Sequence, residues 1–268
     1  MEVLPRVSVL VVSQAQKAAL AATLAALGAP APAGEGEAPL FEVIVVDCGS
    51  PDGSGRVDED FPHVTVMRLP KNFGWTRAFN IGCRTAKGEF VLHLAPGWQL
   101  PASAVATMIE ALLGQPKAGA VCPSGECFFL PKPGERTLRP APSPETAEYP
   151  GALPVLYPKL ALASMNYFPD KYGQFYADLE LFHKMREAGK RLVVLDGLGL
   201  AGAPEPTPMV DAETAEADRA TGLAAYYAKF YGFGAGLGFW LGQTLGAAAS
   251  FRLGLAGKLL GSTKVDGQ

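Results

Sequence analysis

The sequence LPKNFGWTRAFNIGCRTAKGEFVLHL, residues 69–94, predicts a helix followed by a buried strand. The helix runs from Trp75 to Ala86, and the strand from Glu89 to Leu94 is apolar enough to lie in a core. Val64 to Leu69 predicts another strand just before the helix. A strand, a helix and a strand in this order are typical of a parallel sheet with right-handed crossovers.

The N-terminal part of the chain repeats this alternation. Val7 to Val12 is β-branched and apolar on both faces, which indicates a strand covered by helices on either side. A helix rich in alanine and leucine follows from Ala15 to Leu27, and Phe41 to Val46 is a second buried strand. We therefore expect an α/β fold with a mostly parallel sheet flanked by helices.

The middle of the chain is less regular. Pro123 to Pro158 is rich in proline and glycine and offers only short strand candidates such as Cys127 to Leu130. Regular structure returns as a helix from Phe175 to Ala188 and a strand from Arg191 to Leu195.

Length, charge and cysteine spacing narrow the function. The 268 residues allow one large domain, or one domain with an appendage. A formal net charge of -3 provides no basic surface for a phosphate backbone, so nucleic acid is not expected as a partner. The cysteines show no C-x-x-C spacing, which favours reduced thiols in a cytoplasmic protein. The apolar run at Val7 to Val12 is too short for the core of a signal peptide.

The carboxyl ends of the predicted strands are the expected ligand site, because open parallel sheets bind ligands there. These ends are Ser13-Gln14, Asp47 through Asp52, and Ala95 through Trp98. Asp47 could accept hydrogen bonds from the ring N–H of a base or from a ribose hydroxyl, and Gly49 would let the backbone approach a ligand. The alternative is that Asp47, Ser50 and Asp52 only form a turn or cap the next helix.

Two segments carry a family resemblance. VIVVDCGSPD, residues 43–52, followed by residues 69–94, resembles the family 2 glycosyltransferases, most closely their rhamnosyltransferase-like branch. In that family a strand ends in V-D-D-G-S-x-D, a second segment reads N-x-G-x-x-x-A-x-N-x-G, and a third reads A-x-G-x-[FY]-[VL]-x-x-L before D-x-D or N-P-D. The matching positions of the second and third segments are Asn72, Gly74, Ala78, Asn80, Gly82, Ala86, Gly88, Phe90 and Leu94. The resemblance implies the GT-A fold of nucleotide-diphospho-sugar transferases, a Rossmann-like sheet flanked by helices.

The resemblance continues in FPDKYGQFYADLELFHKMREAGKRLVVL, residues 168–195. On this match Asp178 takes the place of the aspartate that acts as catalytic base or helps form the acceptor site in the family. The glutamate that precedes it in the family has become Ala177, and the second aspartate has become Glu180. The alternative is that Asp178 is an acidic residue favoured only by the dipole at the start of a helix.

The resemblance also implies a donor site. The residues implied to bind the nucleotide sugar are Ser13, Asp47, Gly49, Ser50, Asp52, Asn72, Arg77 and Asn80. Three structural alternatives stay open: Asn72 could only end a strand, Asn80 could only bond a neighbouring loop, and Arg77 could be a solvated surface cation rather than a partner of a phosphate.

The acidic metal motif of the family is missing. Ala95-Pro96-Gly97 replaces it, so we expect no Mg or Mn cofactor. A divalent ion that bridges the donor phosphates stabilises the leaving group by several kcal/mol, and its loss would cost on the order of a thousandfold in rate without a replacement. The replacements that the sequence offers are backbone N–H groups near Gly97 and the cations Arg77, Arg84 and Lys87.

The C-terminal part predicts a helical appendage, residues 208–268, after a GT-A-like domain, residues 1–207. Residues 230–251 carry no charged side chain. Three interpretations stay open: a helix packed on the domain or on a dimer partner, a helix lying on a membrane surface, and a true span. We therefore expect a cytoplasmic protein with either homodimer or peripheral membrane contact through residues 230–260, in the latter case at the inner face of the membrane.

These observations lead to two hypotheses. The first is a glycosyltransferase that moves a hexose or rhamnose from a nucleotide-sugar donor to a glycan or lipid-linked acceptor in polysaccharide biosynthesis, without the usual metal site. The second, motivated by the missing acidic motif, is a catalytically inactive GT-A-like binding or scaffold protein in a surface-polysaccharide assembly system.

Overall fold

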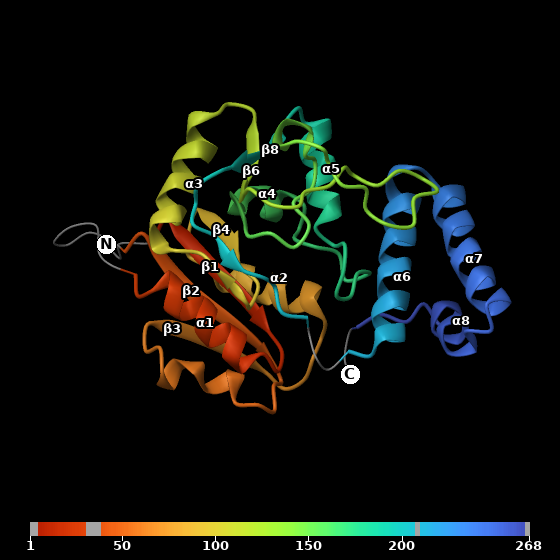
Figure 1. Cartoon of the computed structure of the whole chain (residues 1–268), viewed down its shortest axis with the longest axis horizontal. Helices are drawn as coiled ribbons and strands as arrows, with labels where there is room; N and C mark the ends of the chain where they lie inside the picture. Colours follow the sequence, from red (N-terminus) through yellow and green to blue (C-terminus); the bar gives the residue numbers. More distant parts are fainter. Residues whose placement is uncertain (1–4, 31–38, 207–209, 266–268) are drawn as a thin grey trace.

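The computed structural model describes residues 5–30, 39–206 and 210–265. Its centre is a seven-stranded sheet with the strand order β3-β2-β1-β4-β7-β6-β8 (Figure 1). The strands are β1 Val7–Ser13, β2 Phe41–Cys48, β3 Val64–Leu69, β4 Phe90–His93, β6 Ala118–Pro123, β7 Val155–Pro158 and β8 Arg191–Leu195. Only β7 runs antiparallel to its neighbours, β4 and β6. The expected mostly parallel sheet is confirmed.

Helices cover both faces of this sheet, and two further helices near the C-terminus lie away from it. The helices are α1 Lys17–Leu27, α2 Trp75–Thr85, α3 Ala102–Gly114, α4 Lys159–Ser164, α5 Leu179–Glu187, α6 Ala212–Phe230, α7 Phe233–Ala249 and α8 Leu253–Leu260, with short 3-10 helices η1 Ser54–Glu59 and η2 Pro144–Thr146. On β1, Val7, Val9 and Val11 pack in one core cluster with α1 and α3, while Leu10 packs in a second cluster with α2 and α5. Because successive strand residues point to opposite faces, β1 must be apolar throughout.

The first helix begins two residues later than the sequence predicts. Ala15 adopts a left-handed backbone with φ of 52°, so the chain enters the helix only afterwards. The backbone N–H of Lys17 then donates to Asp52 Oδ2 at 2.9 Å. A carboxylate from the loop after β2 thus caps the free N-terminus of α1.

Two further predictions in the middle of the chain need correction. The helix expected from Phe175 begins at Leu179, because Tyr176 has φ of 69° and cannot lie in a right-handed helix. Cys127 to Leu130 forms no strand, and only Phe128 makes isolated bridges with other loop residues. Apart from η2 and β7, the Pro- and Gly-rich segment therefore folds as loops.

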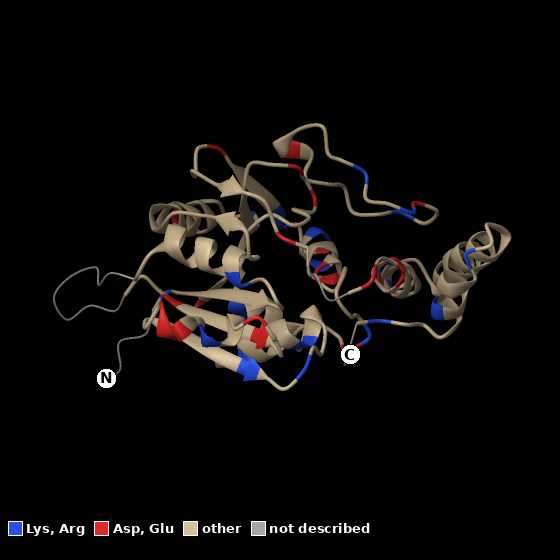
Figure 2. Ribbon diagram, turned by 60° about the horizontal axis from the view of Figure 1, so that its bottom comes forward, with Lys and Arg blue, Asp and Glu red and all other residues tan. Residues whose placement is uncertain are grey.

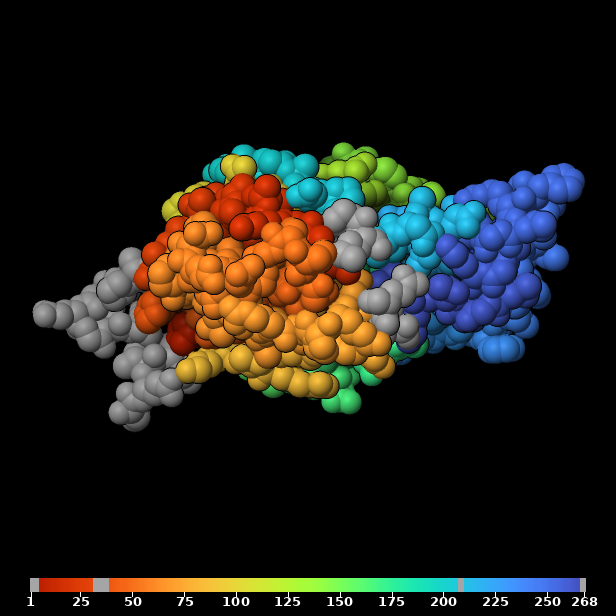
Figure 3. All heavy atoms as spheres, turned by 90° about the horizontal axis from the view of Figure 1, so that it is seen from below, coloured from red at the N-terminus to blue at the C-terminus, as the bar shows by residue number. Residues whose placement is uncertain are grey.

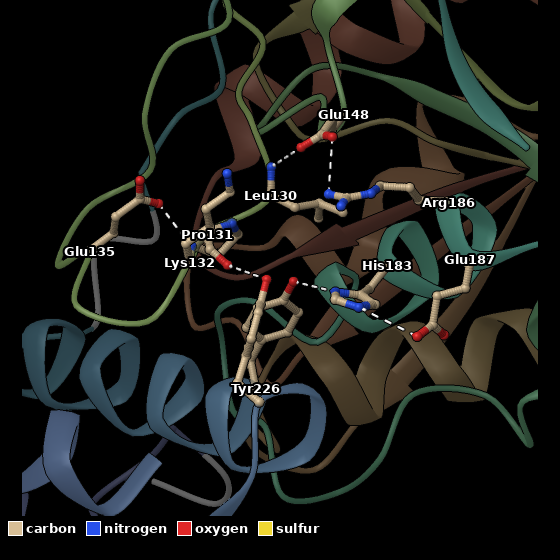
Figure 4. Close-up of polar contacts among 10 residues, drawn as sticks. Leu130, Pro131, Lys132, Glu135, Glu148, His183, Arg186, Glu187 and Tyr226 are labelled. Carbon is tan, nitrogen blue, oxygen red and sulfur yellow. Dashed lines mark hydrogen bonds and ion pairs between the residues drawn. The ribbon is translucent and has the colours of Figure 1, made fainter. Parts of the chain in front are cut away.

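The C-terminal helix α6 packs directly on the domain. Leu223, Tyr226 and Tyr227 are buried in the same core cluster as α2 and α5. The Tyr226 hydroxyl lies 2.7 Å from Nδ1 of His183 on α5 (Figure 4). Lys229 near the end of α6 pairs with the buried carboxylate of Glu180. α6 thus completes the domain core, and the predicted boundary between residues 207 and 208 lies outside the described residues.

The last two helices, α7 and α8, project from one end of the molecule (Figure 3). Four large apolar side chains of α7 at four-residue spacing are exposed: Phe233, Leu237, Leu241 and Leu245. Among the described residues, none of the helices combines the length and the apolar character that a membrane span requires. Lys and Arg are interspersed with Asp and Glu over the rest of the ribbon (Figure 2).

Candidate active site

A cavity of about 540 Å³ opens beside the carboxyl end of β4. Its walls come from parts of the chain that are far apart in sequence. They include Trp75 of α2, His93 of β4, Tyr149 from the loop before β7, Asp178 before α5 and Arg219 of α6. The sequence predicted that the end of β4 binds ligands. The cavity forms where this strand end meets α5 and α6.

Asp178 lies half-buried in this cavity, directly before α5. Asp178 precedes the first residue of the helix, and its side chain makes no N-cap hydrogen bond. The Tyr149 hydroxyl lies 3.0 Å from both carboxylate oxygens and donates its proton to them. Burial raises the pKa of Asp178 to about 6, although the hydrogen bond from Tyr149 acts in the opposite direction. A carboxylate with such a pKa suits a general base near neutral pH.

Trp75 and His93 form an aromatic wall of the cavity, and Trp75 packs on two further rings that do not line it. Trp75 stacks on Phe79 with 4.7 Å between ring centroids, and on Phe168 with 5.8 Å. The indole Nε1 of Trp75 donates to Nε2 of His93 at 3.3 Å. Burial lowers the pKa of His93 to about 4, so its ring is neutral at pH 7. His93 thus orients Trp75 and carries no extra proton to transfer.

Ser13 and Asp47 are neighbours at the ends of β1 and β2, as register partners. Both side chains are buried, and Ser13 Oγ and Asp47 Oδ1 have no hydrogen-bond partner among the described residues. Asp47 Oδ2 accepts from the Ser50 backbone N–H at 3.2 Å. Because an unpaired buried carboxylate oxygen is costly, a ligand group that donates to it would be favoured. Asp47 therefore retains a free acceptor, and its role toward a nucleoside stays a prediction.

A second, smaller cavity of about 20 Å³ lies beside the end of β1. Ser13 lines it, and Trp75 and Gln174 line both cavities, so the two adjoin. Its volume suffices for about one water molecule. A nucleoside at the end of β1 therefore needs the surrounding loops to separate.

The loop after β2 is held by the polar residues that the sequence singled out. Ser50 Oγ accepts from the Ala15 backbone N–H at 2.8 Å, and Asp52 caps α1. Gly49 has φ of +67°, and a Cβ there would lie 2.8 Å from the Cα of Lys71. These contacts show that the turn residues stabilise the fold. A role of the same residues in nucleotide binding stays a prediction.

Three residues in or near α2 were predicted to bind the nucleotide sugar, and their side chains make hydrogen bonds or an ion pair within the protein. The Asn72 side chain accepts from the N–H two residues later at 2.8 Å and lines the small cavity. Asn80 bonds both backbone groups of Phe168, at 2.7 and 3.1 Å. Arg77 is half-exposed and lies 3.7 Å from Asp170. The structure brings none of the three into the large cavity.

The loop Ala95-Pro96-Gly97 is covered by the chain that follows β8. β5 Trp98–Gln99 pairs antiparallel with β9 Ala201–Gly202, and Pro96 O accepts from the Glu205 N–H at 2.9 Å. Gly97 has φ of +98°, and a Cβ there would lie 2.1 Å from a backbone oxygen of the covering chain. Over residues 5–30, 39–206 and 210–265, no group of three or more His, Cys, Asp or Glu side chains could hold a metal ion. Ala95, Pro96 and Gly97 carry no side chain that could ligate a divalent metal, and the expected lack of a metal cofactor stays a prediction.

The comparison with protein families agrees with this geometry. Glycosyl transferase family 2 matches residues 8–169. The chain belongs to this family. The predicted membership is thereby confirmed, and with it the class of glycosyltransferases. No curated protein sequence matches the chain.

Solved glycosyltransferase structures share the fold of this family 2 member. The mannosyltransferase PcManGT from Pyrobaculum calidifontis, in complex with GDP-Man and Mn2+, is 20% identical, with a TM-score of 0.55 over 96% of this chain and 81% of that chain. TarS 1-349 from S. aureus is 16% identical, with a TM-score of 0.54 over 95% and 90%. Glucosyl-3-phosphoglycerate synthase from Mycobacterium tuberculosis, in complex with Mn2+, UDP and phosphoglyceric acid, is 14% identical, with a TM-score of 0.58 over 84% and 78%. At these identities the likeness shows the GT-A fold, as expected, and nothing about ligands.

Sequence reasoning on this family 2 chain missed several residues of the cavity. Tyr149 lies in the irregular Pro- and Gly-rich segment, and Glu205 follows the last strand of the sheet. Arg219 lies on α6, outside the residues that the family matches. No local pattern distinguishes these three residues, because each reaches the cavity through long-range packing.

Proposed function

We propose that the protein transfers a sugar from a nucleotide-sugar donor to a hydroxyl group of a glycan or lipid-linked acceptor, with Asp178 as the general base. The observation that carries this proposal is the half-buried carboxylate of Asp178, oriented by Tyr149 in the large cavity, with a pKa of about 6. The acceptor oxygen bonds to the anomeric carbon as Asp178 takes its proton, and the bond from that carbon to the diphosphate breaks with its electron pair. Membership of family 2 supports this class of reaction.

The donor proposed is a nucleoside diphosphate sugar. The similar structures carry GDP-Man, UDP-GlcNAc or UDP. Asp47, with its free Oδ1, and Ser13, with its free Oγ, are the proposed contacts of the nucleoside. Since the loop at Ala95-Pro96-Gly97 offers no side-chain ligand for a metal, the proposed reaction needs no divalent cation.

A second candidate is a GT-A-like binding or scaffold protein without catalysis. The small cavity beside β1 favours it, because about 20 Å³ cannot take a nucleoside without movement of the loops. In this case a glycan would bind in the large cavity against its aromatic side chains. Asp178 would not act as a base.

Turnover in the presence of EDTA separates the two candidates. Purified protein is incubated with UDP-, GDP- and dTDP-linked hexoses and dTDP-rhamnose, and released nucleoside diphosphate is measured. We expect release with at least one donor and a decrease of about 100-fold or more in Asp178→Asn, because general-base catalysis contributes about 10²–10⁴-fold. Asp170→Asn is the matched control, since this carboxylate is 66% exposed and lies outside the cavity. Release that is equal in wild type and Asp178→Asn contradicts the base assignment, and binding without release supports the scaffold.

We also propose that the exposed apolar side chains of α7 lie on a membrane that holds the acceptor, on its cytoplasmic side. Phe233 and Leu245 are 75% and 65% exposed. A bilayer interface would bury these two side chains. Flotation with phosphatidylglycerol vesicles is expected for wild type and not for Leu245→Asp. A stable dimer that fails to float, detected by light scattering, would assign this face to a second copy instead.

A further inference from the structure

Among the described residues, one positively charged side chain lines the large cavity, and it lies on α6. Arg219 of α6 faces the cavity together with the carboxylates Asp178 and Glu205. Its guanidinium carbon lies 4.1 Å from the centroid of the Phe175 ring. The structure records no ion pair between Arg219 and a carboxylate of the described residues, so its N–H groups remain available at the edge of the stacked plane.

The cations that the sequence suggested lie elsewhere. Arg77 pairs with Asp170, and Arg84 lies 5.1 Å from the centroid of the Tyr167 ring. Neither side chain lines the large cavity, and Lys87 does not line it either. Arg219 is therefore the residue that can supply positive charge where Asp178 acts.

The backbone of Arg219 is held firmly beside the cavity. Its neighbour Asp218 is buried, and the Asp218 carboxylate accepts hydrogen bonds from the backbone N–H groups of Gln174 at 3.0 Å, Phe175 at 3.3 Å and Val265 at 2.7 Å. Because Phe175 carries the ring on which Arg219 stacks, one carboxylate ties the helix to the stacking partner. The guanidinium is thereby positioned before any ligand binds.

Arg219, Asp178 and Tyr176 line the same cavity. Burial raises the pKa of Tyr176, the positive charge of Arg219 acts against this rise, and the negative charge of Asp178 adds to it. A base and a cation on one cavity wall match the two charge changes of sugar transfer, which are the loss of a proton by the acceptor and the gain of charge by the diphosphate.

We propose that Arg219 binds the diphosphate of the donor directly and takes the place of the divalent metal at the leaving group. When the bond between the anomeric carbon and the diphosphate breaks, the electron pair stays on the phosphate oxygen, and the guanidinium donates hydrogen bonds to it. A planar guanidinium suits this contact because it presents two parallel N–H groups to a phosphate. This inference rests on the proposed function, and it assigns the appended helix α6 to the donor site.

Calorimetry in EDTA tests the inference with UDP, GDP and dTDP as probes. Hydrogen bonds to charged groups are worth about 1.5–3 kcal/mol, so Arg219→Gln should weaken binding of the preferred diphosphate by about 10–100-fold. Binding of the corresponding nucleoside should not change, and Arg219→Lys should retain part of the affinity because it keeps the charge. Arg252→Gln is the matched control, because Arg252 makes a surface pair with Glu216 and does not line the large cavity, and it should bind as wild type does.

Several results would overturn the inference, each in a distinct way. If wild type binds a diphosphate and Arg219→Gln binds it equally well, Arg219 is not the phosphate ligand, and the proposed function stands. If wild type binds none of the diphosphates, both proposals fail. An increase of tenfold or more in the affinity of wild type for UDP on addition of Mn²⁺ would show that a metal is used. If Arg219→Gln weakens binding of farnesyl phosphate but not of any diphosphate, the cation serves an acceptor phosphate.

Discussion

The hydroxyl of Tyr149 lies 3.0 Å from Oδ1 and 3.0 Å from Oδ2 of Asp178. Tyr149 is buried, and Asp178 is half-buried on the wall of the large cavity. A neutral phenol that donates to a carboxylate orients the carboxylate without neutralising it. Tyr149 therefore holds the Asp178 carboxylate in one orientation, and the hydrogen bond lowers the pKa of Asp178.

Tyr149→Phe should move the acid limb of the pH–rate profile upward. The hydrogen bond stabilises the ionised form of Asp178, so its removal raises the pKa of this carboxyl further above about 6. The expected change is about one pH unit, since one pKa unit corresponds to ~1.4 kcal/mol. The measurement is kcat/KM against pH. Tyr172→Phe is the control, because the Tyr172 hydroxyl donates to Glu180 at 2.9 Å and does not line the cavity. An unchanged limb in Tyr149→Phe would contradict a role for Asp178 as base.

Asp178→Asn should stabilise the fold at neutral pH while it removes activity. The pKa of Asp178 is about 6 in the folded protein and near 4 in the unfolded chain, so the folded state binds the proton more tightly. Ionisation of Asp178 therefore costs stability above pH 6, and this cost disappears below about pH 4. Urea unfolding should show a gain of about 1–3 kcal/mol at pH 7.5. The gain should vanish at pH 4, and a variant less stable than wild type at pH 7.5 would refute the burial argument.

Gly97→Ala should destabilise the protein more than a glycine replacement elsewhere with a similar backbone. A left-handed backbone costs an ordinary residue about 1–2 kcal/mol, and at residue 97 the new Cβ also meets a backbone oxygen at 2.1 Å. Gly134→Ala is the matched control, because Gly134 has φ of +94° with no atom within 4 Å of the added Cβ. Thermal unfolding should rank the stabilities as wild type, Gly134→Ala and Gly97→Ala. Gly97→Asp should be destabilised likewise and should not acquire dependence on Mn²⁺.

Asp218→Ala should loosen the wall of the large cavity. The variant leaves three backbone N–H groups without their acceptor, at about 1–3 kcal/mol each for those that water cannot reach. We expect a clear loss of thermal stability and weaker binding of nucleoside diphosphates, since Arg219 loses its anchor. Glu216→Gln, on the same helix, removes a surface pair with Arg252 and should cost less than about 1 kcal/mol. Equal losses in both variants would contradict the anchoring role of Asp218.

The fold was largely accessible from the sequence. The alternation of apolar strands and helices from Val7 to Leu94 predicted the parallel part of the sheet, because residues that face a core on both sides must be apolar. The antiparallel strand β7 was not predicted, since its residues, Val155–Pro158, follow a long irregular segment. Its direction depends on pairing with β4 and β6, which no local pattern expresses.

The candidate site was accessible only in part. Asp178 and the missing acidic motif at Ala95-Pro96-Gly97 could be identified from the sequence, because each lies in a short segment with a family pattern. The residues that surround Asp178 could not be identified from the sequence. Tyr149 contacts Asp178 from an irregular loop, and Arg219 lines the same cavity from α6, each through packing between distant segments.

The sequence by itself determined the α/β class, the family and the position of one candidate base, because periodicity and short motifs are local properties of the chain. Only the tertiary structure decided that Asn80 bonds the Phe168 backbone, that Gly97 lies under the chain after β8, and that Arg219 faces the cavity. These outcomes depend on which distant segments pack together. Packing minimises buried unpaired polar groups and empty volume over the whole molecule, so it cannot be evaluated one segment at a time.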